Sequence, residues 1–175
     1  LEMTVAMAFD YFAKSNVDIA VIETGLGGRL DSTNILNPLV SLITNIGLDH
    51  KEFLGNNLID IANEKAGIIK KDIPIVISEF QKATYPIFAN KAHTIETDIF
   101  LADDQKKFKT DLSGDFQNKN INGVVKVISL LKDFSISNKD IENGLLNIKK
   151  NTGLMGRVQI LNDLPKVICD VGHNI

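Results

Sequence analysis

The sequence predicts an α/β fold with a mostly parallel, doubly wound sheet. Short, mostly apolar segments typical of strands, at residues 19–22, 40–44 and 73–78, alternate with segments of helical periodicity. This alternation is typical of parallel strands joined by crossover helices. The chain has 175 residues, of which 44% are hydrophobic, so it is also long enough to bury a sizeable core.

The first half of the chain carries most of this pattern. In order, we expect a helix over 2–14, a strand over 18–23, a glycine-rich loop over 24–38, a strand over 40–44, a helix over 58–70, a strand over 73–78 and a helix over 82–93. The run Ile19 to Ile22 is apolar throughout, as expected of a strand buried on both faces. The first helix is apolar on nearly all sides, which indicates that it belongs in a larger body.

The second half begins with short strands and turns over 94–115. A helix from about Asn120 follows, and another starts at Ser137, a typical N-cap with Asp140 three residues later. The helical pattern breaks at Gly153. We therefore expect one domain over 1–152, and a hinge with the beginning of a second domain over 153–175.

Composition excludes several classes of protein. The net charge of −3 gives no broad basic surface for nucleic acid or an anionic membrane, and no apolar run reaches the roughly 18 residues of a membrane helix. The single cysteine, Cys169, excludes an internal disulfide and fits a reducing compartment, so we expect a cytoplasmic protein. The chain starts inside a helical pattern and stops just after a strand, and we expect it to be a piece of a longer protein.

The glycine-rich loop is the strongest candidate site. Glu23 ends the first apolar run, and three glycines (Gly25, Gly27 and Gly28) lie within the four residues 25–28. Ligands of open α/β sheets bind at the carboxyl ends of strands, where glycines let the backbone approach them. A dinucleotide fingerprint is a poor fit, because Leu30 stands where the third glycine of that motif belongs.

Two arginines stand out in a chain that otherwise uses lysine. Arg29 and Arg157 are the only arginines among 19 basic residues, and each directly follows a glycine. The planar guanidinium offers a two-pronged fork for phosphate or carboxylate, which makes Arg29 a candidate substrate ligand. The alternative of two ordinary surface arginines stays open.

A lysine lies on the apolar stripe of the helix over 58–70. Lys65 is four residues after Ile61 and seven after Leu58, so it shares their face. It must extend to solvent, pair with an acid or lose its charge. A neutral amine can react with carbon dioxide to give a carbamate, an oxygen ligand suited to Mg²⁺. Extension to solvent is the simpler alternative.

Two histidines follow predicted strands beside an acid: His50 next to Asp49, and His173 near Asp170. If Glu23, His50 and Lys65 met at one rim of the sheet, they would offer oxygen and nitrogen ligands to a hard cation. Mg²⁺ fits better than Zn²⁺, because the chain has no cluster of thiolates.

Four motifs together resemble the folylpolyglutamate synthase/dihydrofolate synthase branch of the Mur ligase superfamily. They are Glu23-Thr-Gly-Leu-Gly-Gly-Arg-Leu-Asp-Ser-Thr-Asn34, Gly47-Leu-Asp-His50, Ile61-Ala-Asn-Glu-Lys-Ala-Gly-Ile-Ile-Lys70, and Gly156-Arg157 with Asp170-Val-Gly-His-Asn174. They occur in the family's order and cover essentially the whole chain. The resemblance implies a Mur-ligase central domain over 1–152 and the start of a Rossmann-like C-terminal domain over 153–175.

The resemblance further implies a monomeric, ATP-dependent amide ligase. ATP would phosphorylate a carboxylate of dihydropteroate or a reduced folate, and the amine of L-glutamate would attack the acyl phosphate. Glu23 matches a Mg²⁺ ligand, and His50 matches the ligand of a second Mg²⁺. Lys65 matches the family's carbamylated lysine, and Asp31 a position that holds the pterin.

Other matched positions lie later in the chain. Gln117 and Asn120 match a Gln-x-x-Asn motif whose Asn contacts adenine, and Arg157 matches an arginine that contacts ATP. Asp170 and the candidate catalytic residue His173 match the nucleotide and glutamate side of the cleft. Met155 stands where the family usually has a proline, and we expect this change to loosen the hinge but to leave Arg157 in place.

The phosphate-binding loop of relatives lies upstream of Leu1, so we expect the isolated chain neither to turn over nor to bind ATP tightly. A cell-wall Mur ligase is disfavoured by the Gly25–Asp31 run. A non-catalytic nucleotide-binding remnant or scaffold is the alternative, and joint retention of Glu23, His50 and Lys65 argues against it. Whether the protein acts on dihydropteroate, on reduced folates or on both stays open.

Overall fold

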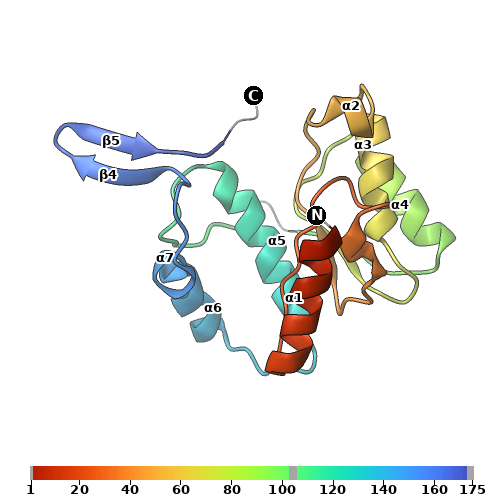
Figure 1. Ribbon diagram of the computed structural model, residues 1–175, viewed down its shortest axis with the longest axis horizontal. Helices are drawn as coiled ribbons and strands as arrows, with labels where there is room; N and C mark the ends of the chain where they lie inside the picture. The colour runs from red at the N-terminus through yellow and green to blue at the C-terminus, as the bar shows by residue number, and fades with distance from the viewer. Residues whose placement is uncertain (1, 103–105, 173–175) are drawn as a thin grey trace. The chain divides into compact units, whose positions relative to one another are not determined.

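The computed structural model describes residues 2–102 and 106–172 (Figure 1). The chain forms two compact units. The first contains the residues up to Ser41, Ile46–Ile75 and Gln81–Ile99; the second contains Leu42–Asn45, Val76–Phe80 and the residues from Phe100 onward. Among the described helices, none is long and apolar enough to cross a membrane.

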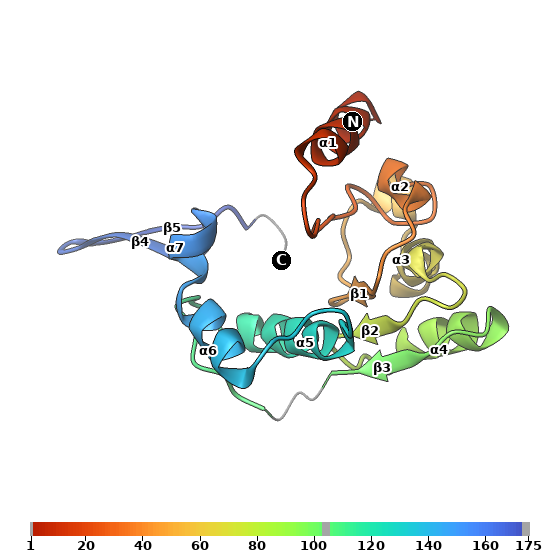
Figure 2. The ribbon, with the colours of Figure 1, turned by 90° about the horizontal axis from the view of Figure 1, so that it is seen from below.

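A parallel sheet of three strands forms in the order β1 (Ser41–Ile43), β2 (Ile75–Ile77) and β3 (Ile99–Leu101) (Figure 2). The Ser41 amide donates to the Pro74 carbonyl at 3.0 Å, and the Ser78 amide donates to the Ile43 carbonyl at 2.9 Å. Between these two bonds the chain advances from Ser41 to Ile43 in β1 and from Pro74 to Ser78 along β2, so the two strands run in the same direction. All three residues of β2 are buried. The predicted α/β class is confirmed.

The first unit contains three predicted helices, which are α1 (Glu2–Ser15), α3 (Leu58–Lys65) and α4 (Tyr85–Thr94). It also contains the short helix α2 (Lys51–Leu54), which was not predicted, and the 3-10 turns η1 (Ser32–Ile35) and η2 (Ala66–Ile68). Helices α3 and α4 pack on each other and on η2. Their core is apolar and includes Ile61, Ala62 and Phe88, each at most 1% exposed. No residue of α1 is buried.

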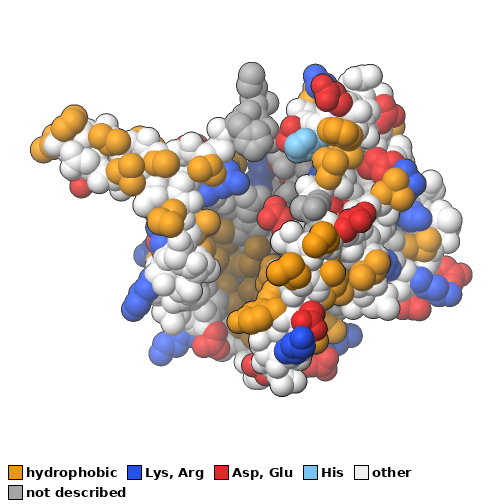
Figure 3. All heavy atoms as spheres, viewed as in Figure 1, with side chains coloured by type: hydrophobic (Ala, Val, Ile, Leu, Met, Phe, Trp, Pro, Cys, Tyr) orange, Lys and Arg blue, Asp and Glu red, His pale blue; other side chains and the backbone are white. Residues whose placement is uncertain are grey.

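The second unit contains α5 (Phe116–Leu130), α6 (Asn138–Leu146), α7 (Ile148–Thr152) and a hairpin of β4 (Gln159–Asp163) and β5 (Lys166–Cys169). The predicted start of α6 is confirmed, because Ser137 and Asp140 form a reciprocal capping box. Hydrophobic side chains lie along the exposed hairpin (Figure 3), among them Leu161 and Ile168.

The strand predicted over 18–23 is wrong. Residues 19–22 form no strand, and Val21 is 93% exposed. An apolar run becomes a strand only where a neighbouring strand supplies hydrogen bonds, and none of the described strands pairs with this segment. Glu23 therefore follows an irregular segment rather than a buried strand.

Candidate functional site

The glycine-rich loop of the first unit folds around the carboxylate of Asp31. The amides of Gly25 and Leu26 both donate to Oδ2 at 2.9 Å. The amide and the hydroxyl of Thr33 donate to Oδ1, so that Asp31 is also the N-cap of η1. One side chain thus organises both ends of the loop.

These hydrogen bonds decide the charge state of Asp31. Burial is the largest single effect and raises the pKa of the carboxyl. The hydrogen bonds from Thr33, Leu26 and Gly25 together outweigh burial and hold the pKa below its ordinary value of 3.8. The carboxylate is therefore ionised at neutral pH, and its charge strengthens all four bonds.

We expect Asp31→Asn to destabilise the chain at pH 7 by about 1–3 kcal/mol, because the amide group accepts fewer and weaker hydrogen bonds. A lowered pKa contributes stability above 3.8, and this contribution is lost as the pH falls through the folded-state pKa. The difference between wild type and variant should thus shrink below pH 3.8. Urea unfolding of both proteins across this range measures it, and a difference independent of pH would contradict it.

The loop is attached to the end of α3. The Arg29 guanidinium donates to both carboxylate oxygens of Glu64, at 2.9–3.2 Å, and the Arg29 amide donates to the Glu64 carbonyl at 2.9 Å. The Asn34 side chain donates to the carbonyls of Arg29 and Gly67. The Lys70 ammonium donates to the carbonyl of Asn34 at 2.7 Å and to that of Leu36. No role is predicted from the sequence for Glu64, Asn34 or Lys70.

The three residues proposed to hold metal lie on different segments of the same unit. Glu23 precedes the glycines and is exposed. His50 is the N-cap of α2, with φ of 49°, and its Nε2 lies 3.6 Å from Asp49 Oδ2. Lys65 ends α3 and is half-buried, and its side chain makes no hydrogen bond or ion pair with the described residues.

Packing at Gly27 brings these segments together. A methyl group at Gly27 would lie 2.8 Å from the Leu54 side chain of α2 and 3.6 Å from Glu64 Cβ of α3. Within the described ranges, no three His, Cys, Asp or Glu side chains gather to hold a metal ion. The donor set suits a hard cation, because Mg²⁺ commonly takes few protein ligands and completes its shell with phosphate and water.

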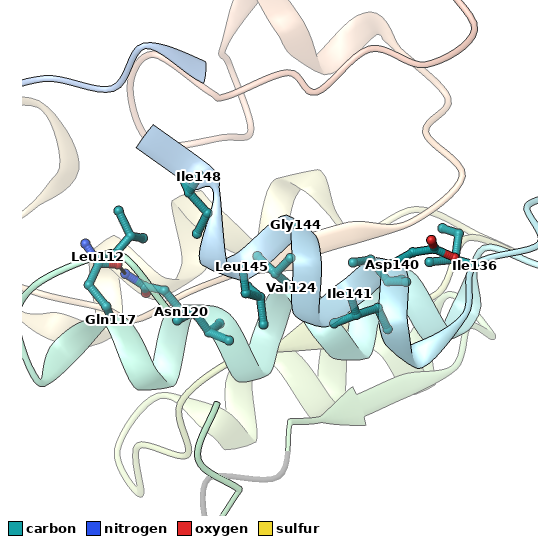
Figure 4. A pocket seen from close by; sticks show the side chains of 12 residues that line it. Leu112, Gln117, Asn120, Val124, Ile136, Asp140, Ile141, Gly144, Leu145 and Ile148 are labelled. Atoms are coloured by element: carbon teal, nitrogen blue, oxygen red, sulfur yellow. Dashed lines mark hydrogen bonds between the residues drawn. The ribbon is translucent and has the colours of Figure 1, made fainter. Parts of the chain in front are cut away.

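The first turn of α5 in the second unit places two carboxamides beside an apolar groove (Figure 4). Asn120 Nδ2 donates to Gln117 Oε1 at 3.2 Å. The groove has a volume of about 440 Å³, and its walls come mainly from apolar side chains of α5, α6 and α7, including Val124, Ile141 and Ile148. Gln117 and the predicted adenine contact Asn120 are thus adjacent and lie at one end of this groove.

The remaining predicted residues lie next to the hairpin. Asp170 accepts hydrogen bonds from the amides of Gly172 at 2.6 Å and Val158 at 2.8 Å. The hydrogen bond from the Gly172 amide lowers the pKa of Asp170 most, and the bond from the Val158 amide is next in size. The charge of Arg157 lowers this pKa further. Arg157 is exposed. His173 lies outside the described residues.

Comparison with known proteins identifies the family. The model of the Mur ligase middle domain matches residues 2–165. A probable dihydrofolate synthetase of Schizosaccharomyces pombe is 36% identical, and the dihydrofolate synthase/folylpolyglutamate synthase of Bacillus subtilis is 33% identical; each match covers 99% of this chain and 46% of the relative. The chain therefore spans about half the length of these relatives.

Solved structures agree with this result. A complex described as FPGS–AMPPCP–folate superposes with a TM-score of 0.87 at 28% identity, covering 97% of this chain and 47% of the other. The folylpolyglutamate synthase of Thermotoga maritima gives a TM-score of 0.79 at 31% identity, covering 98% of this chain and 44% of the other. The chain belongs to the Mur ligase family, in its folylpolyglutamate synthase/dihydrofolate synthase branch, and carries the middle domain.

Proposed function

We propose that the protein, at the full length of its relatives, is an ATP-dependent ligase that adds L-glutamate to dihydropteroate or to a reduced folate. The observation that carries the proposal is the loop around Asp31, which is bonded to a helix that ends at Lys65, whose amine has no partner among the described residues. It occurs in a chain 36% identical to a probable dihydrofolate synthetase.

The proposed reaction forms an amide bond at the expense of ATP. The γ-phosphoryl group passes to a substrate carboxylate, which leaves ADP and an acyl phosphate. The amine of L-glutamate attacks the acyl carbon, loses a proton and displaces phosphate. Such catalysis consists mostly of positioning and of neutralising phosphate charge, so the protein has to hold its substrates in register.

The first unit would supply the metal-binding residues. Glu23 and His50 would hold Mg²⁺, two ions in all, and the metal would neutralise charge on the phosphates. The Lys65 amine would add carbon dioxide and release a proton, and the resulting carbamate would offer oxygen atoms. The side chain bonds to none of the described residues, so no partner has to be displaced before it takes this role.

The same unit would hold the pterin through Asp31. A pterin edge presents two N–H donors, which a carboxylate can accept side by side. A carboxylate has about four acceptor positions, and internal donors occupy four in this structure. A bound pterin would therefore replace an internal donor, such as the Thr33 hydroxyl.

The second unit would supply nucleotide contacts. A purine needs flat apolar walls and hydrogen-bonding groups at its edge, and the groove beside Gln117 and Asn120 provides both. Arg157 would contact phosphate through its guanidinium fork. Asp170 and His173 remain proposals for the nucleotide and glutamate side. We further propose a cytoplasmic monomer.

The test measures ADP release by the protein completed to the length of its relatives, with Mg-ATP and L-glutamate. One reaction receives dihydropteroate, one receives tetrahydrofolate, and a control receives neither. We expect release above the control with at least one acceptor, accompanied by a glutamylated product in mass spectrometry. The absence of release with both acceptors would contradict the proposal and favour a non-catalytic binding module.

A further inference from the structure

Residues 29–34 of the glycine-rich loop are joined to residues 64–70 by side-chain and backbone contacts. We call Arg29, Asn34, Glu64, Gly67 and Lys70 the loop–helix lock. Every member bonds or packs across this junction, as described above. The junction separates two groups to which we assign substrate and metal roles: Asp31 on the loop and Lys65 on the helix.

The ion pair between Arg29 and Glu64 has short, directional contacts although both side chains are partly exposed to solvent. The Arg29 side chain is 56% exposed and that of Glu64 26% exposed, and three guanidinium contacts at 2.9–3.2 Å give a two-pronged geometry. Exposed ion pairs contribute little to stability. Its directional geometry instead fixes how the loop lies on the helix.

The backbone of the glycine-rich loop also packs closely against the end of α3 and against η2. A methyl group at Gly67 would lie 2.3 Å from Arg29 Cα, and one at Gly28 would lie 3.2 Å from Lys65 Cα. The loop backbone thus lies directly against the turn that carries Lys65. Any tilt of the loop changes the separation of Asp31 and Lys65.

We propose that Arg29 and Glu64 are positioning residues, which hold Asp31 and Lys65 at the separation that one bound folate substrate requires. This inference rests on the proposed function. It gives the Arg29 fork a partner within the chain, in place of a substrate carboxylate or phosphate. The pterin would bind at Asp31, while the reacting carboxylate would have to reach Lys65.

Loss of the lock should affect turnover more than binding. A displacement of about 1 Å between reacting groups can cost about 10²-fold in rate. The pterin contacts at Asp31 and the nucleotide contacts in the second unit do not include the ion pair. We therefore expect kcat to fall about tenfold or more, while KM for the folate changes less than about threefold.

The experiment uses the protein completed to the length of its relatives, with Arg29→Lys, Glu64→Gln and the exchanged pair Arg29→Glu with Glu64→Arg. The two single variants should lower kcat with KM for the folate nearly unchanged, and the exchanged pair should recover part of the loss. As a control, Glu96→Gln removes the exposed Lys71–Glu96 pair (3.4 Å) by the same chemical change and should leave kcat unchanged.

Hydrogen exchange provides a readout independent of activity. The amides of Gly25 and Leu26, bound to Asp31, should exchange faster in Glu64→Gln than in wild type or Glu96→Gln. A raised KM with unchanged kcat would overturn the inference and make Arg29 a direct substrate ligand. Unchanged kinetics in active protein would also overturn it, whereas inactive wild-type protein would contradict the proposed function itself.

Discussion

Replacing Lys65 with alanine is expected to lower ligation by the completed protein about 10²- to 10³-fold, the range found when a preorganised group that stabilises a transition state is removed. The fold should remain intact, because the Lys65 side chain is half-buried and makes no hydrogen bond or ion pair with the described residues. Steady-state ADP release measures the rate, and thermal unfolding checks that the midpoint stays within a few degrees of wild type.

Two further variants show which property of Lys65 matters. Lys65→Arg keeps a positive charge on a long side chain, but the guanidinium stays protonated and cannot form a carbamate. It should be as inactive as Lys65→Ala, and added acetate should partly restore the alanine variant by supplying a carboxylate. Lys82→Ala, at an exposed lysine, is the control. An active Lys65→Arg protein would contradict the carbamate and leave Lys65 as a simple cation.

The sequence predicts those parts of the fold that depend on local periodicity. The strand predicted over 73–78 is apolar except for Ser78, and β2 is indeed buried. The capping signal of Ser137 and Asp140 locates the start of α6 because both partners lie within one turn. The start of α5 is missed by a turn, since residues 117–120 are polar and the apolar stripe begins only at Ile121.

Properties that depend on distant partners are not predictable in this way. Residues 19–22 have the composition of a strand, but no described strand pairs with them. The Arg29 fork was expected to bind a ligand, yet its carboxylate partner, Glu64, lies 35 residues later in the chain. Both motifs were visible in the sequence, but periodicity gives no information on how one lies against the other.

The same limit applies to the site. Sequence patterns select Glu23, His50, Lys65 and Asp31 as chemically suited residues. They do not reveal that Asp31 accepts four internal hydrogen bonds, because those donors are positioned by the folded loop. The roles of these residues in binding metal and substrate stay predictions.

Gly67→Ala is expected to disrupt the packing of the loop on the helix by adding a single methyl group. The new Cβ would lie 2.3 Å from Arg29 Cα and 2.7 Å from Arg29 N, whereas ordinary contact begins near 3.4 Å. Backbone atoms cannot rotate away as the end of a side chain can, so the loop must move about 1 Å from η2. Overpacking of this kind costs about 1–3 kcal/mol, and the displacement should lower kcat about 10²-fold.

The matched control is Gly47→Ala, because nothing lies within 4 Å of the added methyl group and Gly47 has no positive φ. Alanine there restricts the unfolded chain and should leave stability unchanged or raise it by up to about 1 kcal/mol. Urea unfolding and kcat are measured for both variants. If Gly67→Ala lowers stability but not kcat, the loop can shift without moving Asp31 relative to Lys65. The close approach of Gly67 to Arg29 would then serve only to fold the domain.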